Sequence, residues 1–510
     1  MEHPPRLRRS LVLAGLVVSS TLALTGCFSA ATATSSDDGG RVSIAMLNPP
    51  RSGLTPLSDD AFKLSRWSTA ETLVVLDDNG DAQPALATEW KQEGDHGWVF
   101  TIRDGVRFHD GTELTAEAVA HSLTVAAAAT PVPRILNGVE LTVAVDGETV
   151  RITTADVDPL VPQRLSSPQL SILAQSAYGA DGVVNPVKAG TGPFVLTSVD
   201  GTSSATLDRN EDYWGTPAIA SGIDVSFVPD GTARAAALRT GTADIVEAIP
   251  VSQVALLDQD LVYEVPMPRT NTLYLNTETG PFSDPGVRAA AAAAVERATI
   301  VANVYEGRAD EASGLLGPAL PWAAELRDRP AYRKTLDAAA QAASVNGVPI
   351  TLGTFTDRAE LPEVAVLLQQ QLEAAGFVVT QDVREYQYIE ADALAGSFDA
   401  FILSRATVID SGDPVAYLYS DFHCDGTFNI SQLCDPAVDA AIEAASATAA
   451  GEARREAISD AEATIIATGA AVPMLHERVI QGEAAGTVGA ARDPRERVLV
   501  TAKTHFDRKR

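Results

Sequence analysis

Basic residues are scarce in this chain of 510 residues, and the shortage limits its possible partners. The 38 lysines and arginines are outnumbered by 67 aspartates and glutamates, which gives a formal net charge of −29 at pH 7. So acidic a chain repels phosphate backbones and anionic lipid surfaces. We therefore expect no nucleic-acid partner, and no basic patch that holds the protein to a membrane.

The motifs of secreted hydrolases are also missing. The sequence contains neither G-x-S-x-G nor H-E-x-x-H, and its seven histidines are scattered. His109 and Asp110 are adjacent in sequence, which does not build a catalytic triad. We expect no enzymatic activity, no cofactor and no bound metal.

Long apolar runs are absent except at the N-terminus. Residues 11–23 form an apolar stretch that follows Arg6, Arg8 and Arg9 and is too short to span a bilayer. This pattern predicts a secretory signal over residues 1–26. The Arg8-Arg9 pair raises the twin-arginine route, but its flanks favour the general route.

The signal ends in Leu24-Thr25-Gly26-Cys27, which resembles the bacterial lipobox. The resemblance implies cleavage before Cys27 and a diacylglycerol on its sulfur. An anchor of two or more acyl chains holds a protein stably at a membrane. The alternative is an ordinary signal with a chance cysteine. Residues 27–40 are small and polar and predict a flexible tether to the extracytoplasmic face of the bacterial cell membrane.

Only three cysteines occur, and Cys424 and Cys434 remain if Cys27 carries lipid. A pair of cysteines in an exported protein predicts a disulfide. Two free thiols are the first alternative. A metal site that includes His423 is the second, although this spacing is not a standard zinc pattern.

The length exceeds what one hydrophobic core usually supports, so we expect two or three domains. A helix over 362–375, a glycine and a strand from 377 form an α/β unit, and similar alternation along the chain predicts an α/β fold. Alternation and turn signals predict the other elements. We expect strands at 41–46 and 99–102, a hairpin of 140–145 with 149–154, and helices at 115–123, 287–304, 435–447 and 452–468.

Several segments, in order, resemble the signature of one family, the extracytoplasmic solute-binding proteins of ABC importers for peptides and nickel chelates (family 5). The segments are WVFTIRDGVRFHDGT (98–112), GTGPF (190–194), RNEDYWG (209–215), ALRTGTADI (237–245), LNT (275–277) and PFSDPGVR (281–288). Each match is weak, but six in sequence are specific. Their aromatic residues are expected to anchor the core, so this signature indicates fold rather than chemistry.

The resemblance implies an α/β, two-lobed periplasmic-binding-protein type II fold with an extra subdomain in the first lobe. It places the first lobe at 41–269, with the subdomain at 78–188, the second lobe at 270–473, and a return to the first lobe at 474–510. It further implies a monomer that closes around a solute and delivers it to an ABC permease and its ATPase. A receptor that feeds a sensor instead is an alternative.

The ligand prediction centres on Asp410, three residues before Asp413-Pro414. In the peptide-binding branch, which the chain resembles here, an aspartate at this place binds the α-ammonium of a peptide. A charge-assisted hydrogen bond in a closed cleft is strong and orients the ligand. The alternative is that Asp410 caps a turn beside Gly412.

The peptide carboxylate requires a cation, and the resemblance suggests Arg358 or Arg405, although neither aligns without a shift. Each could instead belong to a surface or interdomain charge pair. The nickel branch of the family is the main competitor. It places an arginine and a histidine where this chain has Ser167 and Val415. A peptide is therefore favoured over a nickel chelate, while another metal chelate or a small cationic solute stays an alternative.

Overall fold

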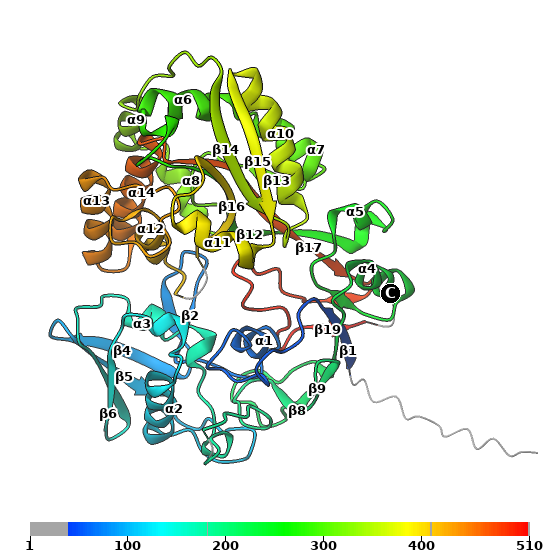
Figure 1. The fold of residues 1–510 in the computed structure, drawn as a ribbon. Helices are drawn as coiled ribbons and strands as arrows, with labels where there is room; N and C mark the ends of the chain where they lie inside the picture. The colour runs from blue at the N-terminus through cyan, green and yellow to red at the C-terminus, as the bar shows by residue number, and fades with distance from the viewer. Residues whose placement is uncertain (1–38, 181, 409–410, 508–510) are drawn as a thin grey trace, which may run out of the picture. The chain divides into compact units, whose positions relative to one another are not determined.

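A mixed sheet of eleven strands runs through the fold (Figure 1). The computed structural model describes residues 39–180, 182–408 and 411–507. From one edge to the other the strands are β15 (Phe377–Arg384), β14 (Val348–Phe355), β16 (Ala400–Ala406), β12 (Val262–Leu275), β17 (Ala471–Glu483), β11 (Ile245–Val246), β1 (Gly39–Met46), β10 (Ala220–Phe227), β9 (Ser204–Arg209) and β8 (Phe194–Asp200), and β13 (Ala309–Glu311) pairs with β17.

The two long strands β12 and β17 join the halves of this sheet. They pair antiparallel from Val262 opposite Gly482 to Tyr274 opposite Ala471. Their register shifts between Pro266 and Thr270, where β12 has more residues than β17. Such a bulge bends a strand and increases its twist.

A separate four-stranded antiparallel sheet carries the region predicted as the extra subdomain. Its order is β4 (Ala87–Glu93), β5 (Gly97–Ile102), β7 (Thr149–Thr154) and β6 (Leu141–Asp146). The predicted hairpin is confirmed as β6 and β7. Two small pairs complete the strands, β2 (Val74–Leu76) with β3 (Ala82–Pro84) and β18 (Thr487–Val488) with β19 (His505–Phe506).

The described residues contain fourteen α-helices, and a helix begins within two residues of each of the five predicted starts. They are α1 (Ala61–Arg66), α2 (Ala116–Ala128), α3 (Val161–Arg164), α4 (Gly231–Thr240), α5 (Val251–Val254), α6 (Pro285–Ala294), α7 (Arg297–Val304), α8 (Pro321–Leu326), α9 (Pro330–Asp337), α10 (Glu360–Ala374), α11 (Tyr386–Leu394), α12 (Val415–Phe422), α13 (Pro436–Ala447) and α14 (Glu452–Ala467). Thr115 caps α2 by accepting a hydrogen bond from the Ala118 amide.

Two local expectations are wrong. The helix predicted over 287–304 is broken into α6 and α7, because the Gln371 side chain of α10 accepts a hydrogen bond from the Glu296 amide at 3.1 Å. The strand β1 begins at Gly39 rather than at residue 41, since parallel pairing with β10 starts at Ala220. The predicted tether therefore loses its last two residues to the sheet.

Buried side chains form three clusters. The largest draws its residues from 273 to 475. A second combines residues 42–245 with Leu499 and Val500, and a small third one surrounds Leu238 and Ile249. We call the part around the first cluster the second lobe, and the part around the other two the first lobe. The predicted residue limits of the lobes stay a prediction.

Candidate ligand-binding site

Two of the segments that resemble the family signature, 190–194 and 209–215, meet around the carboxylate of Glu71. Thr191 and Trp214 donate hydrogen bonds to its Oε2 at 2.7 and 2.9 Å, and the Tyr213 hydroxyl donates to Oε1 at 2.8 Å. Burial raises the pKa of the Glu71 carboxyl, and the three donors act in the opposite direction. Both carboxylate oxygens of Glu71 therefore accept hydrogen bonds from within the first lobe.

A second junction lies between His109 and the glycines of the 190–194 segment. The His109 amide donates to the Gly190 carbonyl at 2.8 Å, and its Nε2 lies 2.9 Å from the Gly192 carbonyl oxygen. A Cβ atom on Gly190 would lie 2.0 Å from the Thr69 carbonyl oxygen, so only glycine fits there. These motifs hold the first lobe together, which agrees with their expected role in the fold.

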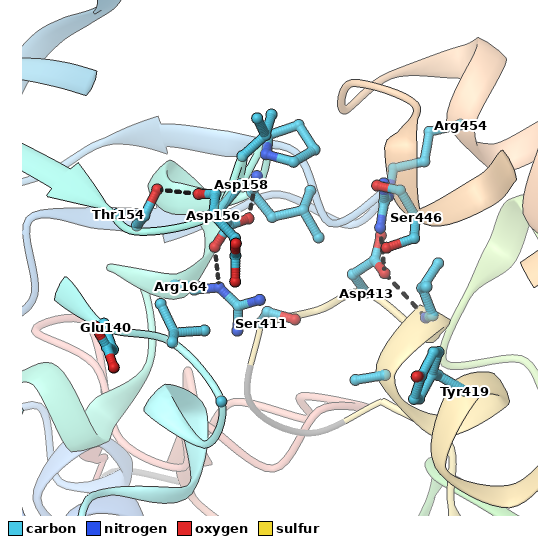
Figure 2. Close-up of a pocket in the computed structure, with 17 residues that line it drawn as sticks. Glu140, Thr154, Asp156, Asp158, Arg164, Ser411, Asp413, Tyr419, Ser446 and Arg454 are labelled. Atoms are coloured by element: carbon cyan, nitrogen blue, oxygen red, sulfur yellow. Dashed lines mark hydrogen bonds and ion pairs between the residues drawn. The ribbon is translucent and has the colours of Figure 1, made fainter. Parts of the chain in front are cut away.

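A cavity of about 330 Å³ lies between the two lobes (Figure 2). We call it the interlobe cavity. The first lobe contributes Glu140, Asp156 and Arg164, and the second lobe contributes Ser411, Asp413 and Tyr419. Apolar side chains complete the wall, including Leu160 and Val415. A concave, mixed surface of this size can hold a small solute.

Two ion pairs border the interlobe cavity. Arg164 pairs with Asp158 on the first lobe, and Arg454 donates to Asp413 at 2.6 Å on the second. Arg454 also donates to the Ala445 carbonyl at 2.7 Å and is thereby fixed to the end of α13. Both arginines are therefore held by the protein itself.

The lobes also touch directly beside this cavity. Arg455 of α14 donates to both carboxylate oxygens of Asp81 at 2.9 and 3.1 Å. A Cβ atom on Gly80 would lie 2.9 Å from the Gly412 carbonyl oxygen, which shows how closely the two backbones approach. The loop that contains Asp413 thus contacts the turn between β2 and β3.

The principal predicted ligand residue, Asp410, lies outside the described residues, and so does Cys27. The neighbours of Asp410 are informative, because Ser411 and Asp413 both line the interlobe cavity. Val415, which stands where the nickel branch has a histidine, lines it too. Ser167 is fully buried and caps a short 3-10 helix by accepting from the Gln169 amide.

Arg405 is held by a buried carboxylate. Its Nη2 and Nε atoms lie 2.8 and 2.9 Å from Asp421, and its guanidinium stacks on Phe428 at 4.2 Å. Burial raises the pKa of the fully buried Asp421 to about 6, with Arg405 acting in the opposite direction. The pair neutralises itself inside the second lobe, so it is neither a surface pair nor an interdomain pair.

Arg358 is likewise paired. Its Nη1 lies 2.8 Å from Oε2 of Glu477, and the Asn271 amide group donates to the other oxygen of Glu477 at 3.0 Å. Asn271 also donates to the Tyr305 hydroxyl at 2.9 Å. Neither of the two predicted arginines presents an uncompensated charge.

A third arginine, Arg269, was missed by sequence reasoning. It lies on β12 opposite Ala406 of β16, and its side chain makes no hydrogen bond or ion pair with any described residue. Nothing in its sequence context marks it, because β12 carries no family motif at this place. Its neighbourhood becomes visible only when β12, β16 and β17 are assembled.

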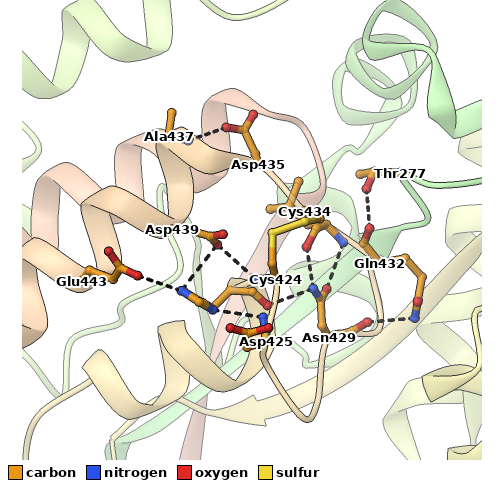
Figure 3. The surroundings of a disulfide bond; sticks show 12 residues. Thr277, Cys424, Asp425, Asn429, Gln432, Cys434, Asp435, Ala437, Asp439 and Glu443 are labelled. Carbon is orange, nitrogen blue, oxygen red and sulfur yellow. Dashed lines mark hydrogen bonds and ion pairs between the residues drawn. A yellow bond between two sulfur atoms is a disulfide. The ribbon is translucent and has the colours of Figure 1, made fainter.

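Cys424 and Cys434 form a disulfide in the structure (Figure 3). The Cys424 amide donates to Asp439 at 3.0 Å, and the His423 Nε2 lies 3.5 Å from Glu443. Residues 39–180, 182–408 and 411–507 contain no group of three or more histidine, cysteine, aspartate or glutamate side chains arranged to hold a metal ion. Over the same residues, no helix is long and apolar enough to cross a membrane.

Two α/β lobes with a cavity between them define a solute-binding protein of the periplasmic type. The chain matches the profile of the bacterial extracellular solute-binding proteins, family 5 Middle, over residues 81–429, and it belongs to this family. The predicted family is thereby confirmed. The family consists of binding proteins and not of enzymes.

Curated relatives bind different solutes. The chain is 30% identical over 296 residues to the glutathione-binding protein GsiB of Escherichia coli, which covers 55% of this chain and 57% of that protein. It is 29% identical over 269 residues to the nickel-binding periplasmic protein of Escherichia coli, covering 50% and 51%. The matched region thus spans about half the length of these relatives.

Solved structures match over almost the whole chain. The nickel ABC transporter from Bacillus halodurans superposes with a TM-score of 0.78 at 25% identity, covering 92% of this chain and all of that one. NikA from Brucella suis with Fe(III)-EDTA gives 0.77 at 23% identity, covering 91% and 100%. DppA from Helicobacter pylori with the peptide STSA gives 0.69 at 22%, covering 92% and 98%. The predicted two-lobed α/β fold is confirmed.

Proposed function

We propose that this protein is the solute-binding component of an ABC importer and that it captures di- or oligopeptides in the cleft between its lobes. The observation that carries the proposal is the position of the 411–414 loop. Ser411 and Asp413 line the interlobe cavity, and Asp410 directly precedes Ser411 in the sequence. Asp410 then binds the peptide ammonium.

Two comparisons support a peptide. The curated relative GsiB is described as binding glutathione, which is itself a peptide, and the superposable DppA structure holds the peptide STSA. The interlobe cavity also has acidic side chains, Glu140 and Asp156, that are exposed and make no ion pair with another described residue. Negative charge at the mouth of a cleft attracts a ligand with a cationic end.

The proposal includes a lipid anchor at Cys27 on the extracytoplasmic face of the membrane, and delivery to a permease that an ATPase drives. A strongly acidic chain requires such an anchor to stay at an anionic surface. In fractionated cells, a Cys27→Ala variant is expected to leave the membrane or to stall during processing. Unchanged membrane retention would contradict the anchor.

A metal chelate is the second candidate solute. Its support is the superposition on two solved structures, one described as a nickel ABC transporter and one as a complex of NikA with Fe(III)-EDTA. Against it, the places that carry an arginine and a histidine in the nickel branch hold Ser167 and Val415 here, and Ser167 is fully buried. The peptide therefore remains the first candidate.

Calorimetric titration with a library of short peptides tests the proposal. The Asp410→Asn variant should bind a free peptide about 30-fold or more weakly than the unmodified protein, since it leaves the ammonium without an anion. Acetylation of the peptide should cause a similar loss, and the two losses should not add, because both remove the same interaction.

The matched control is Asp146→Asn, at the exposed turn between β6 and β7, which should bind normally. Binding of Ni(II)–histidine with no binding of any library peptide would replace the peptide by the chelate. Normal peptide binding by Asp410→Asn would keep the peptide but remove the assigned role of Asp410.

A further inference from the structure

Arg269 stands apart from the other arginines of this protein. Within residues 39–180, 182–408 and 411–507, three arginine side chains make no hydrogen bond or ion pair: Arg51, Arg239 and Arg269. The first two are exposed, so water solvates them. Arg269 is partly withdrawn from solvent. None of its nitrogen atoms is both fully buried and unpartnered, so the guanidinium keeps some water, but it has lost part of its solvation without gaining a partner among the described residues. An anion from outside the chain can restore what it has lost.

The strand pairing places Arg269 on a polar face of β12. Because side chains alternate along a strand, Arg269 and Asn271 lie on one face, and Thr270 lies on the other. Thr270 donates to the Leu315 carbonyl in the core at 2.7 Å. Asn271 instead joins the Glu477–Arg358 pair. Its Oδ1 atom is buried and has no hydrogen-bond partner among the described residues.

The nearby carboxylates do not neutralise Arg269. Glu477 has both oxygens occupied, one by Arg358 and one by Asn271. Burial lowers the pKa of Arg269, Arg358 and Arg405 lower it further, and Glu477 and Glu496 oppose them. Glu496 therefore lies within electrostatic range, yet it forms no ion pair with Arg269 in this part of the structure.

These groups come from both lobes. Glu477 lies on β17 opposite Ala309 of β13, and Arg358 follows the end of β14, both within the range of the second lobe. Glu496 belongs to a C-terminal segment whose Leu499 amide donates to the Arg66 carbonyl of α1 at 3.1 Å, and Leu499 is buried in the first lobe. Arg269 thus lies where the two lobes meet, next to small Ala406 on its neighbouring strand.

We propose that Arg269 binds an anionic group of the solute, which for a peptide is its carboxylate. The inference rests on the proposed function and names the part of the solute that this residue recognises. The planar fork of a guanidinium matches the two oxygens of a carboxylate. Arg358 and Arg405, which the resemblance suggested for this role, already hold Glu477 and Asp421.

The test uses calorimetry with the tightest-binding library peptide, both as the free acid and as its C-terminal amide. Arg269→Gln should weaken binding of the acid about 30-fold or more, because it leaves a desolvated carboxylate unpaired. The amide should bind wild type and variant with similar affinity. Arg269→Lys keeps the charge but not the planar fork of the guanidinium. Its affinity for the acid should lie between those of wild type and Arg269→Gln.

Arg239→Gln is the control, since Arg239 is exposed and equally unpartnered, and it should bind the acid normally. Thermal unfolding without ligand shows whether each variant is folded. Normal binding of the acid by folded Arg269→Gln overturns the inference and leaves the proposed function intact. Equal losses for acid and amide also overturn it, because the residue then does not recognise the carboxylate.

Glu496 supplies the competing explanation, an internal pair with Arg269 that forms when the lobes move. In that case Glu496→Gln should weaken acid and amide as much as Arg269→Gln does, which would overturn the inference. If no library peptide binds wild type, the proposed function fails instead. The comparison is then made with Fe(III)-EDTA, whose carboxylates should still require Arg269. Unchanged binding of this chelate by Arg269→Gln rejects the inference independently.

Discussion

Glu71 and Arg269 are both charged and both partly withdrawn from solvent, yet their surroundings are opposite. Glu71 accepts hydrogen bonds from Thr191, Tyr213 and Trp214, whereas the Arg269 side chain donates none to a described residue. The first arrangement leaves nothing for a ligand to satisfy. The second leaves a partly exposed charge that has no partner among the described residues. A complete hydrogen-bond shell therefore distinguishes a structural charge from a binding one.

The largest effect is expected from removing the satisfied charge. Glu71→Ala leaves three sheltered donors without an acceptor, and the free energy of unfolding should fall by about 4 kcal/mol. Glu71→Gln keeps the shape and one acceptor and should lose much less. Urea denaturation measures both. A small, equal effect of the two variants would show that the junction around Glu71 does not hold the first lobe.

His476, a buried histidine whose ring is hydrogen-bonded, extends the comparison to the pH dependence of stability. Thr270 gives its hydroxyl proton to the Leu315 carbonyl, so Nδ1 of His476 must donate to Thr270, at 2.9 Å. Burial, with the Arg327 cation, lowers the pKa of His476 to about 4.

The unfolded chain therefore binds one more proton than the folded protein between pH 6.5 and 4. The stability from neutral His476 is complete above pH 6.5 and is lost as the pH falls toward 4, by about 3 kcal/mol. His476→Asn should reduce this pH dependence in urea titrations at several pH values. An unchanged profile in the variant would assign the titration to other groups.

The unsatisfied charge should give an effect of opposite sign. Arg269→Met removes a partly desolvated cation, so the ligand-free protein should become more stable by about 1 kcal/mol. Arg239→Met, at an exposed site, should change the free energy of unfolding by less than about 0.5 kcal/mol. If Arg269→Met is clearly destabilised without ligand, Arg269 has an internal partner and the contrast with Glu71 disappears.

The smallest effect concerns the contact between the lobes. Asp81→Asn weakens the pair with Arg455, which is partly exposed, so solute release in a stopped-flow displacement should accelerate by no more than about 5-fold. Asp392→Asn, which breaks an exposed pair with Arg384 inside the second lobe, serves as control. Equal release from both variants would show that the Asp81 contact does not restrain the lobes.

Local rules predicted much of the secondary structure because their causes are local. The β6–β7 hairpin follows from an Asp-Gly turn, and the start of α2 follows from the Thr115 cap. The break between α6 and α7 has a distant cause, the Gln371 side chain, and no pattern within 287–304 reveals it. Family motifs predicted the two-lobed fold, but not that they would meet at Glu71, which lies in none of them.

The site was predicted less well than the fold. Whether an arginine is available to a ligand depends on which carboxylate reaches it, and these partners are remote in sequence. Arg358 forms an ion pair with Glu477, and Arg405 forms one with Asp421. The roles proposed for Asp410 and Cys27 lie outside the described residues and stay predictions. Arg269 could be found only by excluding every internal partner.

The pairing of β12 with β17 is interrupted beside Arg269. Pro266 faces Arg478 and Thr270 faces His476. Three residues of β12 therefore lie opposite one residue of β17, and Arg269 is one of the three. The ladder between the two strands is therefore disrupted beside this residue, whereas it is regular between Val262 and Pro266. If Arg269 holds the solute as proposed, this contact lies at the place where the pairing of β12 and β17 is interrupted.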